Sequence, residues 1–110
     1  MKNYIDAATT CFLISITDFY ELLQYQAPAD IETSISQVII TSRFSDKLKE
    51  LQDKDNEVIL SNLQNEIEKL IKYDVTEHHL NNANNIILND NLTLTYRFKT
   101  SNILVLDLSN

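Results

Sequence analysis

The sequence contains no glycine at all. This absence excludes motifs in which glycine lets the backbone approach a phosphate or turn sharply at a nucleophile: the P-loop, the dinucleotide-binding fingerprint and the nucleophile elbow. The sequence therefore lacks most nucleotide-binding and hydrolase motifs. Tight turns must instead use asparagine and aspartate, the other residues that best tolerate a positive φ.

The sequence has a single cysteine, Cys11, so no internal disulfide can form, which suits a reducing cytosol. Cys11 opens an apolar run that continues over residues 12–14, and the nearest charges are the acidic Asp6 and Asp18. An activated thiol needs an electropositive setting, whereas the charges nearest to Cys11 are negative. We therefore expect Cys11 to be a buried, inert side chain.

Long hydrophobic runs are also missing, since no stretch approaches the roughly 20 apolar residues of a membrane-spanning helix. The N-terminus, with Lys2, then Asp6 and a short apolar core, is a poor signal peptide. These features predict a cytoplasmic protein that does not bind membranes. The net charge of −7 argues against strong non-specific binding to nucleic acid, which needs clustered Lys and Arg.

The length and the pattern of the chain predict one α+β domain over residues 1–110. We expect helices packed on a small antiparallel sheet that ends in a three-stranded C-terminal meander. Residues 1–35 are expected to form a helical or strand–helix extension. Within them Thr17 or Asp18 can cap a helix that runs through Tyr25.

Residues 37–73 are predicted to form a strand and two helices. The β-branched run Gln37–Thr41 indicates the strand, and Ser45 or Asp46 is expected to begin the first helix. The second helix, residues 57–73, is the clearest in the chain because apolar residues recur at spacings of three and four: Ile59, Leu63, Ile67, Leu70 and Ile71.

The meander is predicted over residues 85–108. Residues 86–88 form a short strand, and residues 92–99 alternate between apolar and polar, which indicates one buried face and one polar face. The last strand, residues 103–108, is almost continuously apolar and is therefore expected to be covered on both faces or to lie centrally in the sheet.

The polar face of residues 92–99 carries Thr93, Thr95, Arg97 and Lys99. It holds two bases and no acid in an otherwise acidic protein. Such a surface can contact RNA phosphates or a carboxylate-bearing partner. The alternative is an ordinary solvated sheet face.

The adjacent His78 and His79 follow Glu77. Adjacent residues do not face one another on a helix and point to opposite faces of a strand, so they do not form a metal site by themselves. We expect exposed loop histidines and predict no metal and no cofactor, although a metal-dependent or hydrolytic enzyme using these histidines stays an alternative.

The order strand, helix, helix and three-stranded meander over residues 37–108 resembles the RelE/ParE toxin superfamily of bacterial toxin–antitoxin modules. Residues 38–44 and 46–51 are similar to the family's opening strand and first helix, and residues 57–70 to its second helix. Residues 91–98 together with 102–106 are similar to its closing hairpin.

This resemblance implies either an mRNA interferase or a binding protein. In a ribonuclease of the interferase type, basic side chains stabilise the scissile phosphate while a 2′-hydroxyl attacks, which makes Arg97 and Lys99 the catalytic candidates. The candidate binding residues are Arg43, Lys47, Thr93 and Thr95. A ParE-like member instead inhibits a protein target and needs no catalytic residue.

The sequence departs from the RNA-cutting members in ways that favour binding. Thr93 stands where those members usually keep an arginine. Those members also often continue past the last strand with a catalytic His or Tyr. They are commonly basic, whereas this protein has a net charge of −7. We therefore expect a toxin-module protein that binds a protein partner, such as an antitoxin or host target, or the translation machinery. The alternative is an acidic phage- or plasmid-encoded inhibitor, of the anti-defence type, that acts by protein–protein interaction without catalysis.

Overall fold

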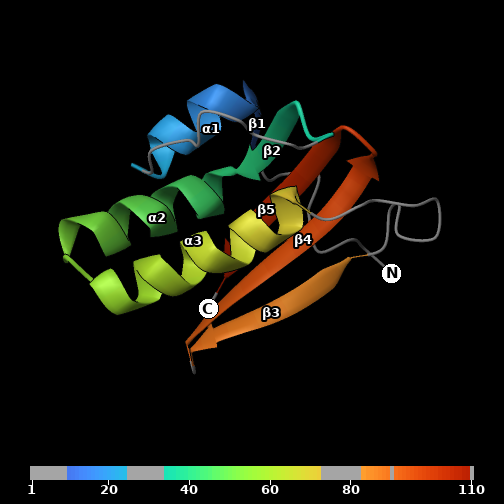
Figure 1. The fold of residues 1–110 in the computed structure, drawn as a ribbon. Helices are drawn as coiled ribbons and strands as arrows, with labels where there is room; N and C mark the ends of the chain where they lie inside the picture. The colour runs from blue at the N-terminus through green and yellow to red at the C-terminus, as the bar shows by residue number, and fades with distance from the viewer. Residues whose placement is uncertain (1–9, 25–33, 73–82, 90, 110) are drawn as a thin grey trace.

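The computed structural model describes residues 10–24, 34–72, 83–89 and 91–109. These residues form an α+β fold, which confirms the predicted class (Figure 1). In chain order the elements are β1 Cys11–Ser15, α1 Ile16–Leu22, β2 Gln37–Thr41, α2 Ser42–Asp53, α3 Glu57–Ile71, β3 Asn84–Asn89, β4 Leu92–Thr100 and β5 Ile103–Ser109.

The strands form a five-stranded sheet in the order β1-β2-β5-β4-β3. The last three strands are the predicted meander, since β3 pairs antiparallel with β4 and β4 pairs antiparallel with β5. The sheet as a whole is mixed, because β2 and β5 are parallel. Two helices and two strands separate β2 from β5 in the chain, so the connection has ample length for a parallel pairing.

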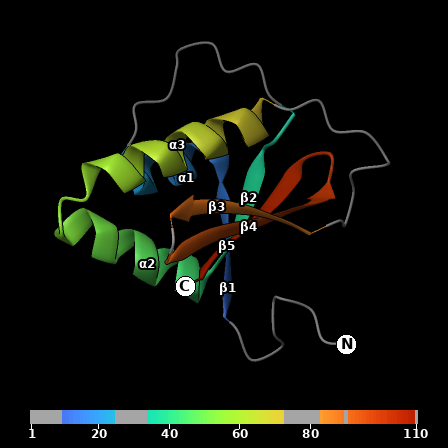
Figure 2. The same ribbon diagram turned by 90° about the horizontal axis from the view of Figure 1, so that it is seen from below.

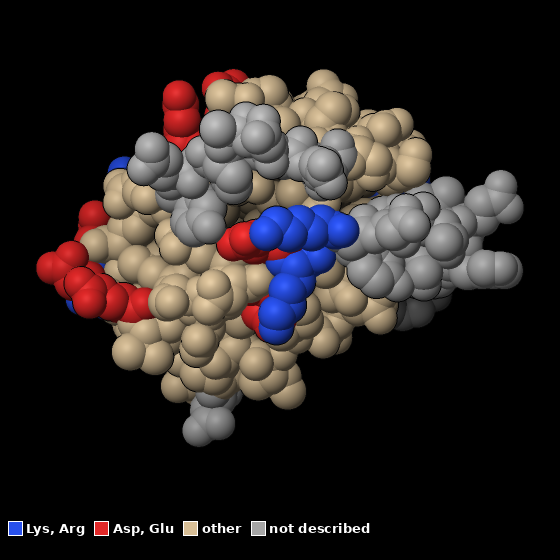
Figure 3. Space-filling model, viewed as in Figure 1, with Lys and Arg blue, Asp and Glu red and all other residues tan. Residues whose placement is uncertain are grey.

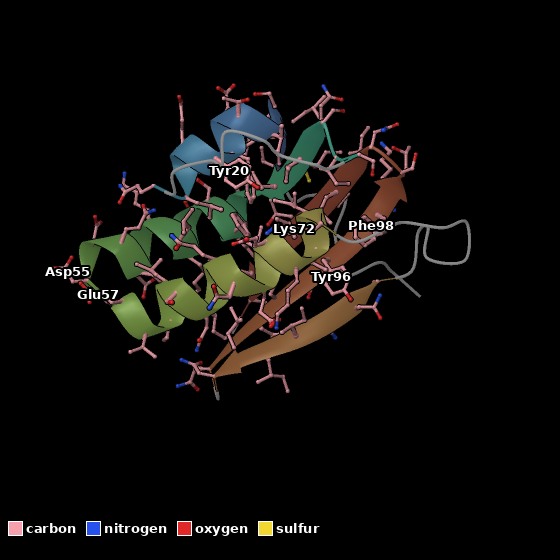
Figure 4. All side chains as sticks on the ribbon, viewed as in Figure 1. Tyr20, Asp55, Glu57, Lys72, Tyr96 and Phe98 are labelled. Carbon is pink, nitrogen blue, oxygen red and sulfur yellow. The ribbon has the colours of Figure 1, made fainter. Side chains whose placement is uncertain are left out.

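All three described helices lie on one face of the sheet (Figures 1 and 2). The hydrophobic core fills the space between them and this face, and α1 contributes to it through Phe19, whose ring centroid lies 6.1 Å from that of Phe44. On β4 the rings of Tyr96 and Phe98 lie side by side, with their centroids 6.1 Å apart, and Figure 4 labels Tyr96 near the C-terminal end of α3. The fully buried core side chains include Phe19, Val38, Phe44, Leu48, Leu63, Ile67, Leu94, Leu104 and Leu106.

The central position predicted for residues 103–108 is confirmed. β5 lies between β2 and β4, and each of its residues from Leu104 to Leu108 is buried. Val105 and Asp107 alternate with the core residues of this strand and therefore lie on the face away from the helices. Both are only 2% exposed.

The start predicted for α2 is wrong. The helix begins at Ser42 and not at Ser45 or Asp46, because the hydroxyl of Thr41 accepts a hydrogen bond from the amide of Phe44 and caps the first turn. The strand β2 therefore passes directly into the helix. The second predicted helix is confirmed as α3 up to Ile71, and Tyr73 lies outside the described residues.

The expectations for α1 and for Cys11 are also corrected. Ser15, and not Thr17 or Asp18, caps α1 by accepting from the amide of Asp18. The helix ends at Leu22, before Tyr25, because Gln24 takes a positive φ of 57°. Cys11 is exposed and not buried, since it lies on the edge strand β1.

The turns replace glycine in two ways. Asp55 takes a positive φ of 50° between α2 and α3, as predicted for aspartate, although Gln24 shows that another residue type also takes this role. Between β4 and β5 the hydroxyl of Thr100 accepts from the amides of Asn102 and Ile103 at 3.1 Å each, so a side chain stabilises the turn.

Candidate functional site

The sheet face away from the helices, here called the outer face, carries most of the residues predicted to be functional. Strand alternation places Thr93, Thr95 and Arg97 of β4 on this face. Thr95 lies opposite Asp107 of β5, and Arg97 lies opposite Val105. The outer face is therefore where the predicted basic strip meets the central strand of the sheet.

The centre of the outer face is an ion pair that the sequence reasoning missed. The carboxylate of Asp107 accepts a hydrogen bond from the Thr41 hydroxyl at 2.5 Å. It also accepts from two nitrogens of Arg43, from Nε at 3.3 Å and from a terminal nitrogen at 2.6 Å. The side chain of Asp107 is 3% exposed and that of Arg43 is 47% exposed.

Each residue of this cluster is placed by its element. Thr41 ends β2 and caps α2, so its hydroxyl bonds to both the helix and Asp107. Arg43 lies in the first turn of α2, which begins beside the end of the parallel strand β5. A lone aspartate inside an apolar strand was the available signal, because a buried carboxylate needs a cation or hydrogen-bond donors.

This geometry changes the role of Arg43. Two nitrogens of its guanidinium are bonded to a carboxylate of opposite charge, in the bidentate arrangement that arginine makes with carboxylates. The pair has little net charge to offer to a phosphate. Arg43 therefore acts as a structural tie between α2 and β5 and is poorly suited to bind RNA.

The two predicted catalytic bases differ in their surroundings. Arg97 is half-buried, and its Nε atom is fully enclosed. Lys99 is exposed, and it lies between Phe98 and Thr100, at the point where the pairing register of β4 with β5 shifts. Phosphoryl chemistry needs fixed charges that converge on one group. Among the described residues, Lys99 offers an exposed charge near this end of β4, whereas Arg97 is held within the surface.

The two threonines are more enclosed than a solvated sheet face would be. Thr95 is 8% exposed, and its hydroxyl donates to the side-chain oxygen of Asn85 on β3 at 2.8 Å. Thr93 is half-buried and lies opposite Ile87 of β3. Thr95 therefore ties β4 to β3, in addition to any role in binding.

Lys47 lies away from the outer face. It lines a groove of about 260 Å³ between α2, the start of α3 and the β3–β4 turn, together with Glu50, Lys54, Asn56 and Asn91. Lys47 is 3.8 Å from Glu50, and Lys54 is 2.9 Å from the same carboxylate. The hydrogen bond from Lys54 and the charges of Lys54 and Lys47 lower the pKa of Glu50. The structure thus separates Lys47 from the other candidates.

The described residues contain no group of three or more His, Cys, Asp or Glu side chains that could hold a metal ion. His78 and His79, the alternative metal or acid–base candidates, lie outside the described residues. Within the described ranges, no helix is long and apolar enough to cross a membrane.

Charges on the helix side are arranged differently from those of the outer face. Over α3, Lys69 and Lys72 pair with Glu66 and Glu68 at 3.3 and 2.6 Å, and Figure 3 shows blue and red atoms in contact there. Acidic side chains gather at the tip between α2 and α3, where Figure 4 labels Asp55 and Glu57.

In comparisons with known proteins, no protein-family model, no curated protein and no solved structure matches this chain.

Proposed function

We propose that this protein is a RelE/ParE-like toxin-module protein that acts by binding a protein partner or the translation machinery. Two features support this function. Over residues 37–108 the chain has the order strand, helix, helix and meander that underlies the resemblance. Its candidate bases do not converge on one exposed position, which favours binding over cleavage of RNA.

The ion pair of Arg43 with Asp107 is the main observation against catalysis. A base that stabilises a scissile phosphate has to present its positive charge to that phosphate. Arg43 is instead bonded twice to the buried carboxylate of Asp107, and Lys47 faces a separate groove beside Glu50. Arg97 and Lys99 on β4 are left as the candidates for an mRNA interferase, and Arg97 is half-buried.

Ectopic expression with growth as the readout tests the proposal. We expect induction of the wild-type chain in a bacterial host to arrest growth, and co-expression of the neighbouring small reading frame to restore it. A chain bearing Phe44→Asp, which places a charge in the core, is the unfolded control and should not arrest growth. Normal growth under wild-type induction, with no antitoxin gene beside this one, would overturn the proposal.

A second candidate function is an acidic inhibitor that acts by protein–protein interaction. The acidic tip supports it, because Asp53, Asp55 and Glu57 are exposed there and the chain carries a net charge of −7. Carboxylates presented this way can occupy a cleft lined by Lys and Arg. Pull-down from the native host tests this function: recovery of a basic partner that a D53N/D55N/E57Q variant loses supports it, and recovery of no specific partner rejects it.

A further inference from the structure

The strand β3 forms one edge of the described sheet, and its pairing with β4 has a register irregularity between Ile87 and Asn89. Edge strands present unpaired backbone groups, and proteins commonly protect them with charged side chains or proline. The six residues of β3, Asn-Asn-Ile-Ile-Leu-Asn, include neither. Ile87, in the middle of the strand, is 75% exposed. This strand is therefore suited to pair with another strand.

We infer that β3 pairs antiparallel with β3 of a second copy of this chain, about a two-fold axis at Ile87. This pairing sets Ile87 against Ile87 on the outer face, where each side chain covers the other. It sets Ile86 against Leu88 on the helix side and Asn85 against Asn89. Within residues 85–89 like side chains meet at each position, and none of these residues is charged.

The helix above β3 favours the same partner. A groove of about 210 Å³ runs between α3 and β3 and is lined by Glu66 and Lys69 of the helix and by Ile86 and Leu88 of the strand. The two-fold axis keeps both helices on the same side of the joined sheet and runs them antiparallel. Glu66 and Lys69 pair with each other at 3.3 Å within one chain and lie on this groove, so the two antiparallel helices bring two oppositely oriented ion pairs to the interface.

The mass of the protein in solution tests the inference. We expect sedimentation equilibrium, from micromolar to millimolar protein, to approach twice the chain mass of 12.7 kDa. Ile87→Lys puts two ammonium groups at the axis and should give the mass of a single chain. Val58→Lys is the matched control, since Val58 is 73% exposed but lies on α3, and this variant should keep the doubled mass.

Disulfide trapping keeps the test decisive if Ile87→Lys fails to fold. In a Cys11→Ser background, Ile87→Cys should form a covalent dimer on mild oxidation, because the axis places position 87 opposite itself. Val58→Cys in the same background should stay single. A wild-type chain that stays at 12.7 kDa at every concentration, or that doubles only when a foreign protein is added, overturns the inference.

Discussion

The carboxylate of Asp107 is almost fully enclosed on the outer face, and its hydrogen bonds come from Thr41 and Arg43. Removing one member of such a pair leaves a buried charge without compensation, which costs more than the intact pair contributes. The stability of the fold should therefore depend on Arg43 more than on the other surface bases.

We expect Arg43→Ala to lower the free energy of unfolding by about 2–3 kcal/mol, at the low end for a buried pair because half of the Arg43 side chain is exposed. Arg43→Lys should restore only part of this loss, since an ammonium cannot make the two parallel bonds. Urea unfolding measures both values. Lys49→Ala, an exposed site on the same helix, is the control, and an equal loss there would contradict this role for Arg43.

Glu50 is a second residue whose side chain has a specific electrostatic role. Its pKa is lowered, first by the hydrogen bond from Lys54 and then by the charges of Lys54 and Lys47. Because the pKa of Glu50 is lower in the folded state, its ionised carboxylate contributes to the stability of the fold above the pKa of the unfolded chain. The contribution is lost as the pH falls through the lower pKa of the folded state.

An NMR titration of the Glu50 side chain checks this assignment. Lys54→Met should raise the pKa of Glu50 toward its ordinary value, and Lys47→Met should raise it less, because Lys47 is farther away and adds only its charge. Lys72→Met on α3 is the control. An unchanged titration in the Lys54→Met variant would show that the pair does not persist in solution.

At the scale of the elements, Thr41 joins a strand, a helix and the buried ion pair. We expect Thr41→Ala to lower the free energy of unfolding by about 2–3 kcal/mol, because the α2 cap and a buried hydrogen bond to Asp107 are both lost. Thr41→Ser should keep most of the stability. Ser15→Ala removes only an exposed cap of α1 and should cost about 1 kcal/mol or less by thermal or urea unfolding. Equal losses for Thr41→Ala and Ser15→Ala would contradict the double role of Thr41.

The elements that the sequence predicted best are those whose pattern reflects burial directly. The alternation of residues 92–99 and the apolar run of residues 103–108 predicted β4 and the central position of β5. The start of α2 was missed because Thr41 reads as the end of a β-branched strand, while its capping role depends on how the chain turns after it. The parallel pairing of β2 with β5 could not be read from local pattern, since strands far apart in the chain make it.

The candidate site was predicted less well than the fold. Alternation placed Thr93, Thr95 and Arg97 on one face, but it could not show that Asp107 lies opposite Thr95. It also could not show that Arg43 reaches this carboxylate across 64 residues of sequence. Whether a base is available to a ligand depends on charge partners that are distant in the chain, and a single sequence does not show which residues pair.

At the scale of the whole molecule, the helices cover one sheet face, and the outer face is tied together by polar bonds at its centre. The edge strand β3 and the acidic tip between α2 and α3 are surfaces suited to contact other proteins. The pair of bases on β4 is the part of the molecule that an RNA-cutting activity would require.

The central claim, that the protein acts by binding and not by cleaving RNA, is tested most directly by inducing Arg97→Ala/Lys99→Ala beside the wild type. Growth and the integrity of cellular mRNA are followed together, with circular dichroism of each purified chain to show that the fold is kept. The account predicts equal growth arrest by both chains and intact mRNA under wild-type induction. Cleaved mRNA under the wild type, lost together with the growth arrest in the double variant, would contradict it.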